Sequence, residues 1–376
     1  MRMKNQLTVK YEEKPIYDII LEKDFTNLLS VFHTILKEER TDTNDQPIFI
    51  NKKVCIVSDS QVSNHYLREV IESLKGHVKE IKTFTFTQGE ESKNLDTVYA
   101  LYDMLITSKF DRKDVLMALG GGVVGDLTGY TAATYLRGIS FIQVPTSLLA
   151  MVDSSIGGKT GVDFHAYKNM IGAFHQPKAV YINLSTLNSL TDRQFNSGFG
   201  EIIKHGLIKD AAYYQWLDEN KEAILSKDLN VLKEMIFRSC EIKRDVVEKD
   251  PKEVGDRALL NFGHTLGHSI EKLMDFKLLH GECVTLGMMA AGYISYKRNY
   301  ITKEQLDRMK ELLEYFKLPV CVSGLSVDDI LQVASHDKKM ESGKLKFILL
   351  NRVGNAIIDT SVTKDELIDA LQYILK

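Results

Sequence analysis

Three glycines follow an apolar run at a spacing that suits a bound phosphate. Val115 to Leu119 has the pattern of a buried strand, and Gly120, Gly122 and Gly125 follow it in the order G-x-G-x-x-G. Glycine lets the backbone turn sharply and lets a phosphate approach the main chain. The helix-like stretch from Val123 to Leu136 would point its first N–H groups at that phosphate. The pattern predicts a phosphorylated ligand, first of all a dinucleotide, although many strand–helix turns use glycines only for packing.

Two histidines four residues apart have the spacing of a metal-binding pair. His264 and His268 lie in Asn-Phe-Gly-His-Thr-Leu-Gly-His, on one side of a predicted helix, and Glu271 is next along that face. His280 begins another helical stretch, and Glu201 lies in Gly-Phe-Gly-Glu-Ile-Ile-Lys-His. Two imidazoles and a carboxylate with one open position suit a catalytic divalent metal. A lone helical histidine is more often a hydrogen-bonded structural group, so spacing leaves open both the metal and its three ligands.

The elements that must position these residues change character near residue 188. Short β-like runs alternate with amphipathic stretches before it, which is typical of crossover helices on a mainly parallel sheet. Helical periodicity dominates after it. We therefore predict an α/β + all-α fold, with a Rossmann-like, mainly parallel N-terminal sheet and a helical C-terminal domain. The predicted strands are Gln6–Tyr11, Val54–Ser58, Ile81–Phe86, Val115–Leu119, Phe141–Val144 and Ala179–Asn183, with a late hairpin of Leu345–Leu350 and Ala356–Asp359. The predicted helices include Asn64–Leu74, Asn94–Ser108, Glu201–Ile208, Val231–Lys249, Leu259–Leu273 and Lys303–Phe316.

Composition and net charge argue against nucleic-acid and membrane partners. The chain has 376 residues and a net charge of −3, so no broad basic field draws it to nucleic acid or to an anionic membrane. Its four cysteines are far apart and form no C-x-x-C, which favours reduced thiols in a cytoplasm. The first residues lack the apolar core of a signal peptide, and the apolar stretch from Cys283 to Tyr296 is too short to span a bilayer. We predict a cytoplasmic protein with neither nucleic-acid nor membrane partners.

Consecutive blocks of the sequence resemble the 3-dehydroquinate synthase family. They are GGGVVGDLTGYTAATYLRG (120–138), QVPTSLLAMVDSSIGGKTGV (143–162), KNMIGAF (168–174), SGFGEIIKHGLI (197–208), RALLNFGHTLGHSIE (257–271) and LLHGECV (278–284). They cover most of residues 88–284 in the order found in that family, which is more specific than any single motif. The resemblance implies an NAD-binding α/β domain over residues 1–187 and a mostly helical metal- and substrate-binding domain over residues 188–376.

The resemblance also implies a ligand set that helix spacing does not give. The metal, zinc or cobalt, falls on Glu201, His264 and His280. His268 then contacts the substrate, although its spacing from His264 would have made it a ligand.

Further site residues follow from the resemblance by position. The implied NAD contacts are Asp59, Gln88, Gly89, Glu90, Glu91, Ser92, Lys93, Gly122, Val123, Val124, Gly125, Asp126, Thr146, Ser147, Lys159, Lys168, Thr186, Leu187, Asn188 and Ser189. The implied catalytic and substrate contacts are Arg137, Asp153, Lys159, Asn169, Lys204, Lys243, Glu253, Arg257, Asn261, His268 and Lys338, or else its neighbour Lys339. Arg137 would reach the neighbouring subunit's site, which implies a homodimer.

The reaction that the resemblance implies is the conversion of 3-deoxy-D-arabino-heptulosonate 7-phosphate, a sugar phosphate, to 3-dehydroquinate and phosphate. NAD takes a hydride from C5, phosphate leaves by elimination, the hydride returns, and the opened ring closes as a carbocycle. No net redox change results. The substrate carries a phosphate and a carboxylate, and such anions are bound by cations or by oriented N–H groups.

The sequence departs from the family pattern in one loop. Asp163 stands where the family commonly has Asn, and Tyr167 where it has Gly. Ser147 follows Thr146 in place of a second threonine, which keeps a hydroxyl group. We expect the first two changes to decorate the loop, because Lys168 and Asn169 are intact.

Other functions share parts of this pattern. A related sugar-phosphate cyclase would keep the glycines, NAD and metal ligands but change its substrate contacts. A metal-dependent alcohol or glycerol dehydrogenase would accumulate NADH and need fewer cations for binding anions. A non-catalytic NAD-binding protein would be expected to lose one of the metal ligands, whereas Glu201, His264 and His280 are all present.

Overall fold

The computed structural model describes residues 5–36, 50–165, 167–275, 277–335, 340–341 and 344–376. They form two compact units that divide between Leu190 and Thr191. The sequence pattern places the change at 187/188. Each unit is described by itself.

A seven-stranded sheet forms the centre of the N-terminal unit, in the order β1-β2-β9-β6-β5-β3-β4. β1 pairs with β2 in antiparallel fashion, and the other neighbours are parallel. The strands are β1 (Gln6–Tyr11), β2 (Lys14–Glu22), β3 (Ile50–Asp59), β4 (Val78–Phe86), β5 (Val115–Gly120), β6 (Ser140–Pro145) and β9 (Ala179–Asn183). The predicted, mainly parallel sheet is confirmed. β2 was not predicted, although its buried Tyr17, Ile19 and Leu21 alternate with less buried residues, as in a strand with one face in the core.

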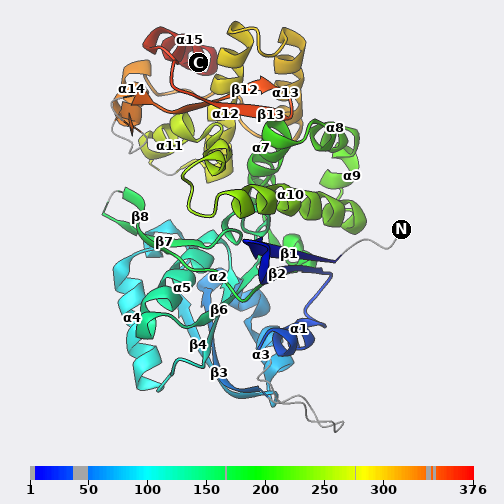
Figure 1. The fold of residues 1–376 in the computed structure, drawn as a ribbon, viewed down its shortest axis with the longest axis vertical. Helices are drawn as coiled ribbons and strands as arrows, with labels where there is room; N and C mark the ends of the chain where they lie inside the picture. Colours follow the sequence, from blue (N-terminus) through cyan, green and yellow to red (C-terminus); the bar gives the residue numbers. More distant parts are fainter. Residues whose placement is uncertain (1–4, 37–49, 166, 276, 336–339, 342–343) are drawn as a thin grey trace. The chain divides into compact units, whose positions relative to one another are not determined.

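Helices cover both faces of this sheet (Figure 1). Alternate residues of β3 show how. Val54 and Ile56 pack with α1 (Leu28–Ile35) and α3 (Arg68–Leu74). Cys55 and Val57 pack with α4 (Leu95–Thr107) and α5 (Gly122–Thr134). A parallel strand that is buried on both faces is apolar throughout, as β5 is. The helices are α1 (Leu28–Ile35), α2 (Ser60–Val62), α3 (Arg68–Leu74), α4 (Leu95–Thr107) and α5 (Gly122–Thr134), with 3-10 helices at Glu90–Ser92, Tyr135–Arg137 and Leu184–Ser189 and π-helical turns at Ser63–Leu67 and Ala150–Ser154.

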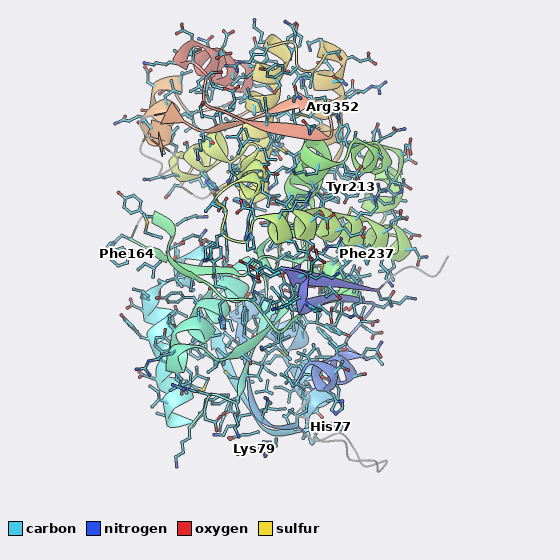
Figure 2. The ribbon with its side chains drawn as sticks, in the orientation of Figure 1. His77, Lys79, Phe164, Tyr213, Phe237 and Arg352 are labelled. Atoms are coloured by element: carbon cyan, nitrogen blue, oxygen red, sulfur yellow. The ribbon has the colours of Figure 1, made fainter. Side chains whose placement is uncertain are left out.

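The loop that carries the departures from the family pattern is a β-hairpin. β7 (Lys159–Phe164) pairs with β8 (Tyr167–Phe174) in a separate two-stranded sheet. Phe164 is 41% exposed and lies at the periphery of the unit (Figure 2). The sequence pattern predicted a loop here, so the hairpin was not predicted.

Helices make up most of the C-terminal unit. They are α6 (Asp192–Ser197), α7 (Phe199–Lys209), α8 (Ala211–Glu219), α9 (Lys221–Leu225), α10 (Leu229–Lys249), α11 (His264–Leu273), α12 (His280–Lys297), α13 (Lys303–Tyr315), α14 (Val327–Ser335) and α15 (Lys364–Ile374), with a 3-10 helix at Asp256–Asn261. The short strands are β10 (Met340–Glu341), β11 (Lys344–Leu345), β12 (Phe347–Arg352) and β13 (Asn355–Asp359). β12 and β13 form the predicted late hairpin. Within the described ranges, no helix has both the length and the apolar character needed to cross a membrane.

The predicted helix Leu259–Leu273 is wrong at its start. Gly263 adopts a left-handed φ of +82° and separates the 3-10 helix from α11, which therefore begins at His264. α11 also packs unusually close to α12, because a Cβ on Gly287 would lie 1.8 Å from the carbonyl oxygen of Gly263. This close approach packs the start of α11 against the first turns of α12.

Candidate active site

One carboxylate oxygen in the C-terminal unit faces two imidazoles. His264 is the first residue of α11, His280 is the first residue of α12, and Glu201 lies on α7. Oε1 of Glu201 is 3.5 Å from Nε2 of His264 and 3.7 Å from Nε2 of His280. Glu201 is fully buried, and its Oε2 contacts the ammonium of Lys204. Three potential metal ligands, one from the first residue of each of two helices and one from a third helix, therefore lie close together.

The other ring nitrogen of each histidine has its own acceptor. Nδ1 of His264 lies 3.2 Å from the carbonyl oxygen of Phe262, and Nδ1 of His280 lies 3.5 Å from Oε2 of Glu271. A hydrogen on Nδ1 satisfies both acceptors, and binding of a metal would require Nε2 of each ring to be free of its proton. Burial lowers the pKa of His280, but hydrogen bonds to Glu201 and Glu271 outweigh it and raise that pKa to about 9.

These donor atoms fit a tetrahedral cation. Two ligand atoms, each about 2.1 Å from a tetrahedral ion, lie about 3.4 Å apart. The two separations from Glu201 Oε1 are 3.5 and 3.7 Å, so small side-chain movements would complete the site. One carboxylate and two imidazoles are also a donor set that suits zinc or cobalt.

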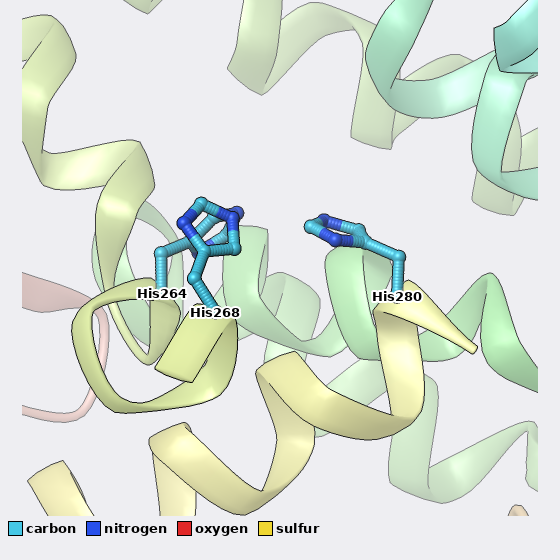
Figure 3. A group of neighbouring side chains, drawn as sticks. All are labelled: His264, His268 and His280. Carbon is cyan, nitrogen blue, oxygen red and sulfur yellow. The ribbon is translucent and has the colours of Figure 1, made fainter. Parts of the chain in front are cut away.

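His268 lies in the same group (Figure 3). Its ring centroid is 5.2 Å from that of His264 and 5.7 Å from that of His280. One nitrogen from each of the three rings falls within 4.8 Å of the others. The structure therefore brings together both the ligand set implied by family resemblance and the histidine favoured by helix spacing.

The NAD residues implied for the N-terminal unit gather at one edge of its sheet. Asp59 ends β3, Gln88 follows β4, Gly122 follows β5, Thr146 follows β6 and Thr186 follows β9. Because these strands are parallel, their carboxyl ends share an edge, where ligands of open α/β sheets bind.

The glycines after β5 have different neighbours. A Cβ on Gly122, the first residue of α5, would meet Ser154 Oγ at 3.1 Å. A Cβ on Gly125 would lie 2.6 Å from Oε1 of Gln143 on β6, so this glycine lets α5 pack closely on the sheet. The third glycine of the motif therefore allows close helix–strand packing, and Gly122 begins the helix whose first N–H groups suit a phosphate.

Comparison with known proteins identifies the family. Residues 83–197 match the N-terminal 3-dehydroquinate synthase family model, and residues 198–340 match the C-terminal one. The 3-dehydroquinate synthase of Acetivibrio thermocellus is 46% identical over 316 residues, which are 84% of this chain and 88% of that protein. The chain belongs to the 3-dehydroquinate synthase family. It is an enzyme with 3-dehydroquinate synthase activity, which is a step of the shikimate pathway.

Other relatives agree with this assignment. The 3-dehydroquinate synthase of Nitrosospira multiformis is 46% identical over 312 residues, or 83% of this chain and 85% of that protein. A structure of 2-epi-5-epi-valiolone synthase from Streptomyces hygroscopicus, with NAD+ and Zn2+ bound, has a TM-score of 0.85 at 26% identity and covers 98% of this chain and 99% of that one. A 2-deoxy-scyllo-inosose synthase complexed with carbaglucose-6-phosphate, NAD+ and Co2+ has the same fold, with a TM-score of 0.84 at 24% identity and coverage of 97% and 99%.

In this enzyme, several of the implied substrate residues are cations with buried side chains. Lys204 on α7, Lys243 on α10 and Arg257 in the 3-10 helix are 1%, 5% and 2% exposed. Burying a cation is unfavourable unless anions compensate it. Nη1 of Arg257 donates to the Pro251 carbonyl at 2.7 Å. For Lys204 that compensation comes from Glu201.

Glu253 and Asn261 belong to the same region of the C-terminal unit. Nδ2 of Asn261 donates to Oε1 of Glu253 at 2.9 Å, and Glu253 has a left-handed φ of +57°. Asp250 supports this loop, because its carboxylate accepts hydrogen bonds from the N–H groups of Val254 and Arg257 at 2.9 and 3.0 Å.

Lys93 connects the implied nucleotide residues of the N-terminal unit. Its ammonium donates to Oδ2 of Asp126 at 2.7 Å and to Oδ1 of Asn169 at 2.6 Å, and it lies 3.9 Å from Oε1 of Glu90. Burial opposes the charge on Lys93, but the carboxylates of Asp126 and Glu90 outweigh it and raise the pKa of the amine. Lys168 lies 3.6 Å from the same oxygen of Glu90. One buried cation thus joins the segment after β4, helix α5 and the β7–β8 hairpin.

Two more of the implied residues, Asp59 and Ser189, are held by local contacts. Asp59 caps α2, because its Oδ1 accepts from the N–H groups of Gln61 and Val62 at 2.9 and 2.8 Å. The Tyr66 hydroxyl donates to Ser189 Oγ at 2.7 Å in the Leu184–Ser189 turn. These contacts hold the Asp59 and Ser189 side chains in place.

Three further implied residues belong to other local elements or fall outside the described residues. Arg137 is exposed and has a left-handed φ of +67° after α5. Asp153 lies in the Ala150–Ser154 π-helical turn. Lys338, like its neighbour Lys339, is outside the described residues. Glu271 was predicted only to share a helix face with His264 and His268, whereas the structure places its Oε2 3.5 Å from Nδ1 of His280.

Proposed function

We propose that this enzyme converts 3-deoxy-D-arabino-heptulosonate 7-phosphate to 3-dehydroquinate and phosphate with one bound NAD and one divalent metal. The observation that supports this site best is the convergence of two Nε2 atoms on Oε1 of the buried Glu201, at 3.5 and 3.7 Å. Family membership supplies the reaction class, and the donor set supports the metal.

Glu201, His264 and His280 would hold the metal, zinc or cobalt. When bound, it supplies Lewis acidity to a substrate oxygen. Lys204 would balance the charge of Glu201 through its contact with Oε2. Lys204 would then face the substrate from α7 as well.

The carboxyl edge of the N-terminal sheet would hold NAD, which supplies a hydride acceptor and donor and so leaves no net redox change. Asp59 would accept hydrogen bonds from ribose hydroxyls through the oxygen that does not cap α2. The start of α5 at Gly122 would bind the pyrophosphate through backbone N–H groups. The remaining proposed contacts are Gln88 to Lys93, Val123 to Asp126, Thr146, Ser147, Lys159, Lys168 and Thr186 to Ser189.

Cationic side chains would bind the two anionic groups of the substrate. Charge-assisted hydrogen bonds suit phosphate and carboxylate, and Arg257 can bind either in bidentate fashion. Orientation of bound groups supplies much of the rate, and the leaving phosphate can itself accept the proton. His268 would relay a proton from a hydroxyl group. The full proposed set is Arg137, Asp153, Lys159, Asn169, Lys204, Lys243, Glu253, Arg257, Asn261, His268 and Lys338.

The biological setting follows from the same family. We propose a cytoplasmic homodimer in which Arg137 acts at the neighbouring subunit's site, with no nucleic-acid or membrane partner. The N-terminal domain binds NAD and the C-terminal domain binds the metal and most of the substrate. Its described cysteines, Cys55, Cys240, Cys283 and Cys321, are free thiols, in keeping with a reducing compartment.

Phosphate release tests this function directly. With NAD and Zn2+ or Co2+, the purified protein should release inorganic phosphate from the heptulosonate phosphate without steady NADH accumulation. A heptulose 7-phosphate without the carboxylate serves as the comparison substrate. Faster phosphate release from that comparison substrate would favour another sugar-phosphate cyclase, and glycerol-dependent NADH formation would favour a dehydrogenase.

A further inference from the structure

The two histidines of the proposed metal site are oriented by acceptors of different kinds. His264 has a backbone acceptor, the Phe262 carbonyl, at 3.2 Å from Nδ1. His280 has a side-chain acceptor, Oε2 of Glu271, at 3.5 Å from Nδ1. A carboxylate that accepts from Nδ1 fixes the tautomer of the ring and makes Nε2 a stronger electron-pair donor. Only the second of these acceptors can be removed by mutation.

Glu271 is built into the unit rather than exposed on it. Its side chain is 4% exposed, and it lies on α11, seven residues after His264 and on the same helix face. Burying a carboxylate is unfavourable unless hydrogen-bond donors compensate it, and the Nδ1–H of His280 is one such donor for Glu271.

The carboxylates of Glu271 and Glu201 lie at different nitrogens of the same ring. Glu201 Oε1 is 3.7 Å from Nε2 of His280, whereas Glu271 Oε2 is 3.5 Å from Nδ1. The two nitrogens of an imidazole point away from each other, so a cation beside Glu201 would face Nε2 and not the Glu271 carboxylate. This arrangement places Glu271 behind His280 and not in the ligand set.

We propose that Glu271 is a positioning residue that tightens metal binding by holding His280. The inference rests on the proposed role of His280 as a ligand. Glu271 acts through the orientation and electron donation of that ring and touches neither substrate nor NAD.

The test is the dissociation constant for Zn2+, measured on the full-length protein by competition with a chromogenic chelator. Glu271→Gln keeps the shape and removes the charge, and Glu271→Asp keeps the charge and withdraws the carboxylate by one methylene. Each should bind Zn2+ about 10- to 100-fold more weakly than the parent. The melting temperature of the metal-free variants, measured in parallel, should stay near that of the metal-free parent. A residue with a merely structural role would instead lower it.

Two further variants make the result decisive. Glu366→Gln removes another hydrogen-bonded carboxylate of the same unit, whose partner is Arg298, and should leave Zn2+ affinity unchanged. His280→Ala should lose Zn2+ affinity. If His280→Ala does so while both Glu271 variants bind Zn2+ within twofold of the parent, the positioning role is refuted and the ligand set stands. If His280→Ala binds Zn2+ like the parent, the ligand set and the positioning role are both refuted.

Discussion

Asp163 Oδ1 accepts a 2.7 Å hydrogen bond from the backbone N–H of Asn169. Asn169 has a left-handed φ of +51° and accepts from the Lys93 ammonium through its side-chain oxygen. The N–H of Asp163 in turn donates to the Lys93 carbonyl at 2.8 Å. Asp163 therefore ties the strained end of the hairpin to the buried lysine, which is more than the surface decoration that we expected from the sequence.

Replacing Asp163 should distinguish its hydrogen bond from its charge. Asp163→Ala removes the acceptor of the Asn169 N–H and should lower kcat/KM for phosphate release about five- to tenfold, since such a bond contributes about 1 kcal/mol. Asp163→Asn keeps an acceptor and should stay within about twofold of the parent in the same assay. Equal losses in the two variants would mean that the charge, and not the hydrogen bond, matters.

Metal removal should abolish turnover and leave the NAD site intact. Protein treated with a chelator should stop releasing phosphate and recover when Zn2+ or Co2+ is added, because the proposed ligands Glu201, His264 and His280 then hold a Lewis acid again. Metal content, phosphate release and NAD binding are measured on the same sample. Full activity of chelator-treated His280→Ala would contradict the ligand assignment.

Gly287→Ala should weaken metal binding although Gly287 is not a proposed ligand. Its new methyl group would lie 1.8 Å from the Gly263 carbonyl oxygen, so α11 and α12 must move apart and the two histidines that begin them must separate. Overpacking of this kind costs about 1–3 kcal/mol, visible as a lower melting temperature together with weaker metal binding.

Gly292→Ala is the matched control on α12. There the nearest atoms are side-chain atoms of Leu306 and Met309 at 3.3 Å, which can give way. We expect a smaller loss of stability and normal metal binding. A Gly287→Ala protein as stable as Gly292→Ala would show that the close helix contact is not required.

The ion pair of Glu366 with Arg298 should make stability depend on pH. The hydrogen bond from Arg298 lowers the pKa of Glu366 to about 2, below its usual value near 4.5. A depressed carboxyl pKa stabilises the fold fully above pH 4.5, and this contribution declines as the pH falls toward 2. Urea unfolding should show Glu366→Gln about 1.5–3 kcal/mol less stable than the parent at pH 7, because a hydrogen bond to a charged group is lost.

That difference in unfolding free energy should shrink between pH 4.5 and pH 3. Lys303→Gln provides the comparison, because its ion pair with Asp307 is on the surface and contributes little. A Glu366→Gln penalty that is constant down to pH 3 would argue against the depressed pKa.

Several features of the fold could be predicted because they are local. Val115 to Leu119 reads as a strand because a strand buried on both faces must be apolar along its whole length. The hairpin of β12 and β13 has its own pattern of β-branched and turn residues. β2 was not predicted, although its apolar residues alternate. The β7–β8 hairpin was not predicted either, because its sequence lacks a clear strand pattern and it forms outside the main sheet.

The sequence by itself determined the kinds of chemistry: a glycine turn for a phosphate, and imidazoles and carboxylates for a metal. Only the tertiary structure decided which carboxylate oxygens lie beside which imidazole nitrogens. Helix periodicity places His264, His268 and Glu271 on one face, but it carries no information about Glu201 on α7 or about the nitrogen that faces it. The close packing of α11 on α12 aims two Nε2 atoms at one oxygen and turns Glu271 toward Nδ1, because contacts between distant segments depend on backbone packing and not on spacing along one helix.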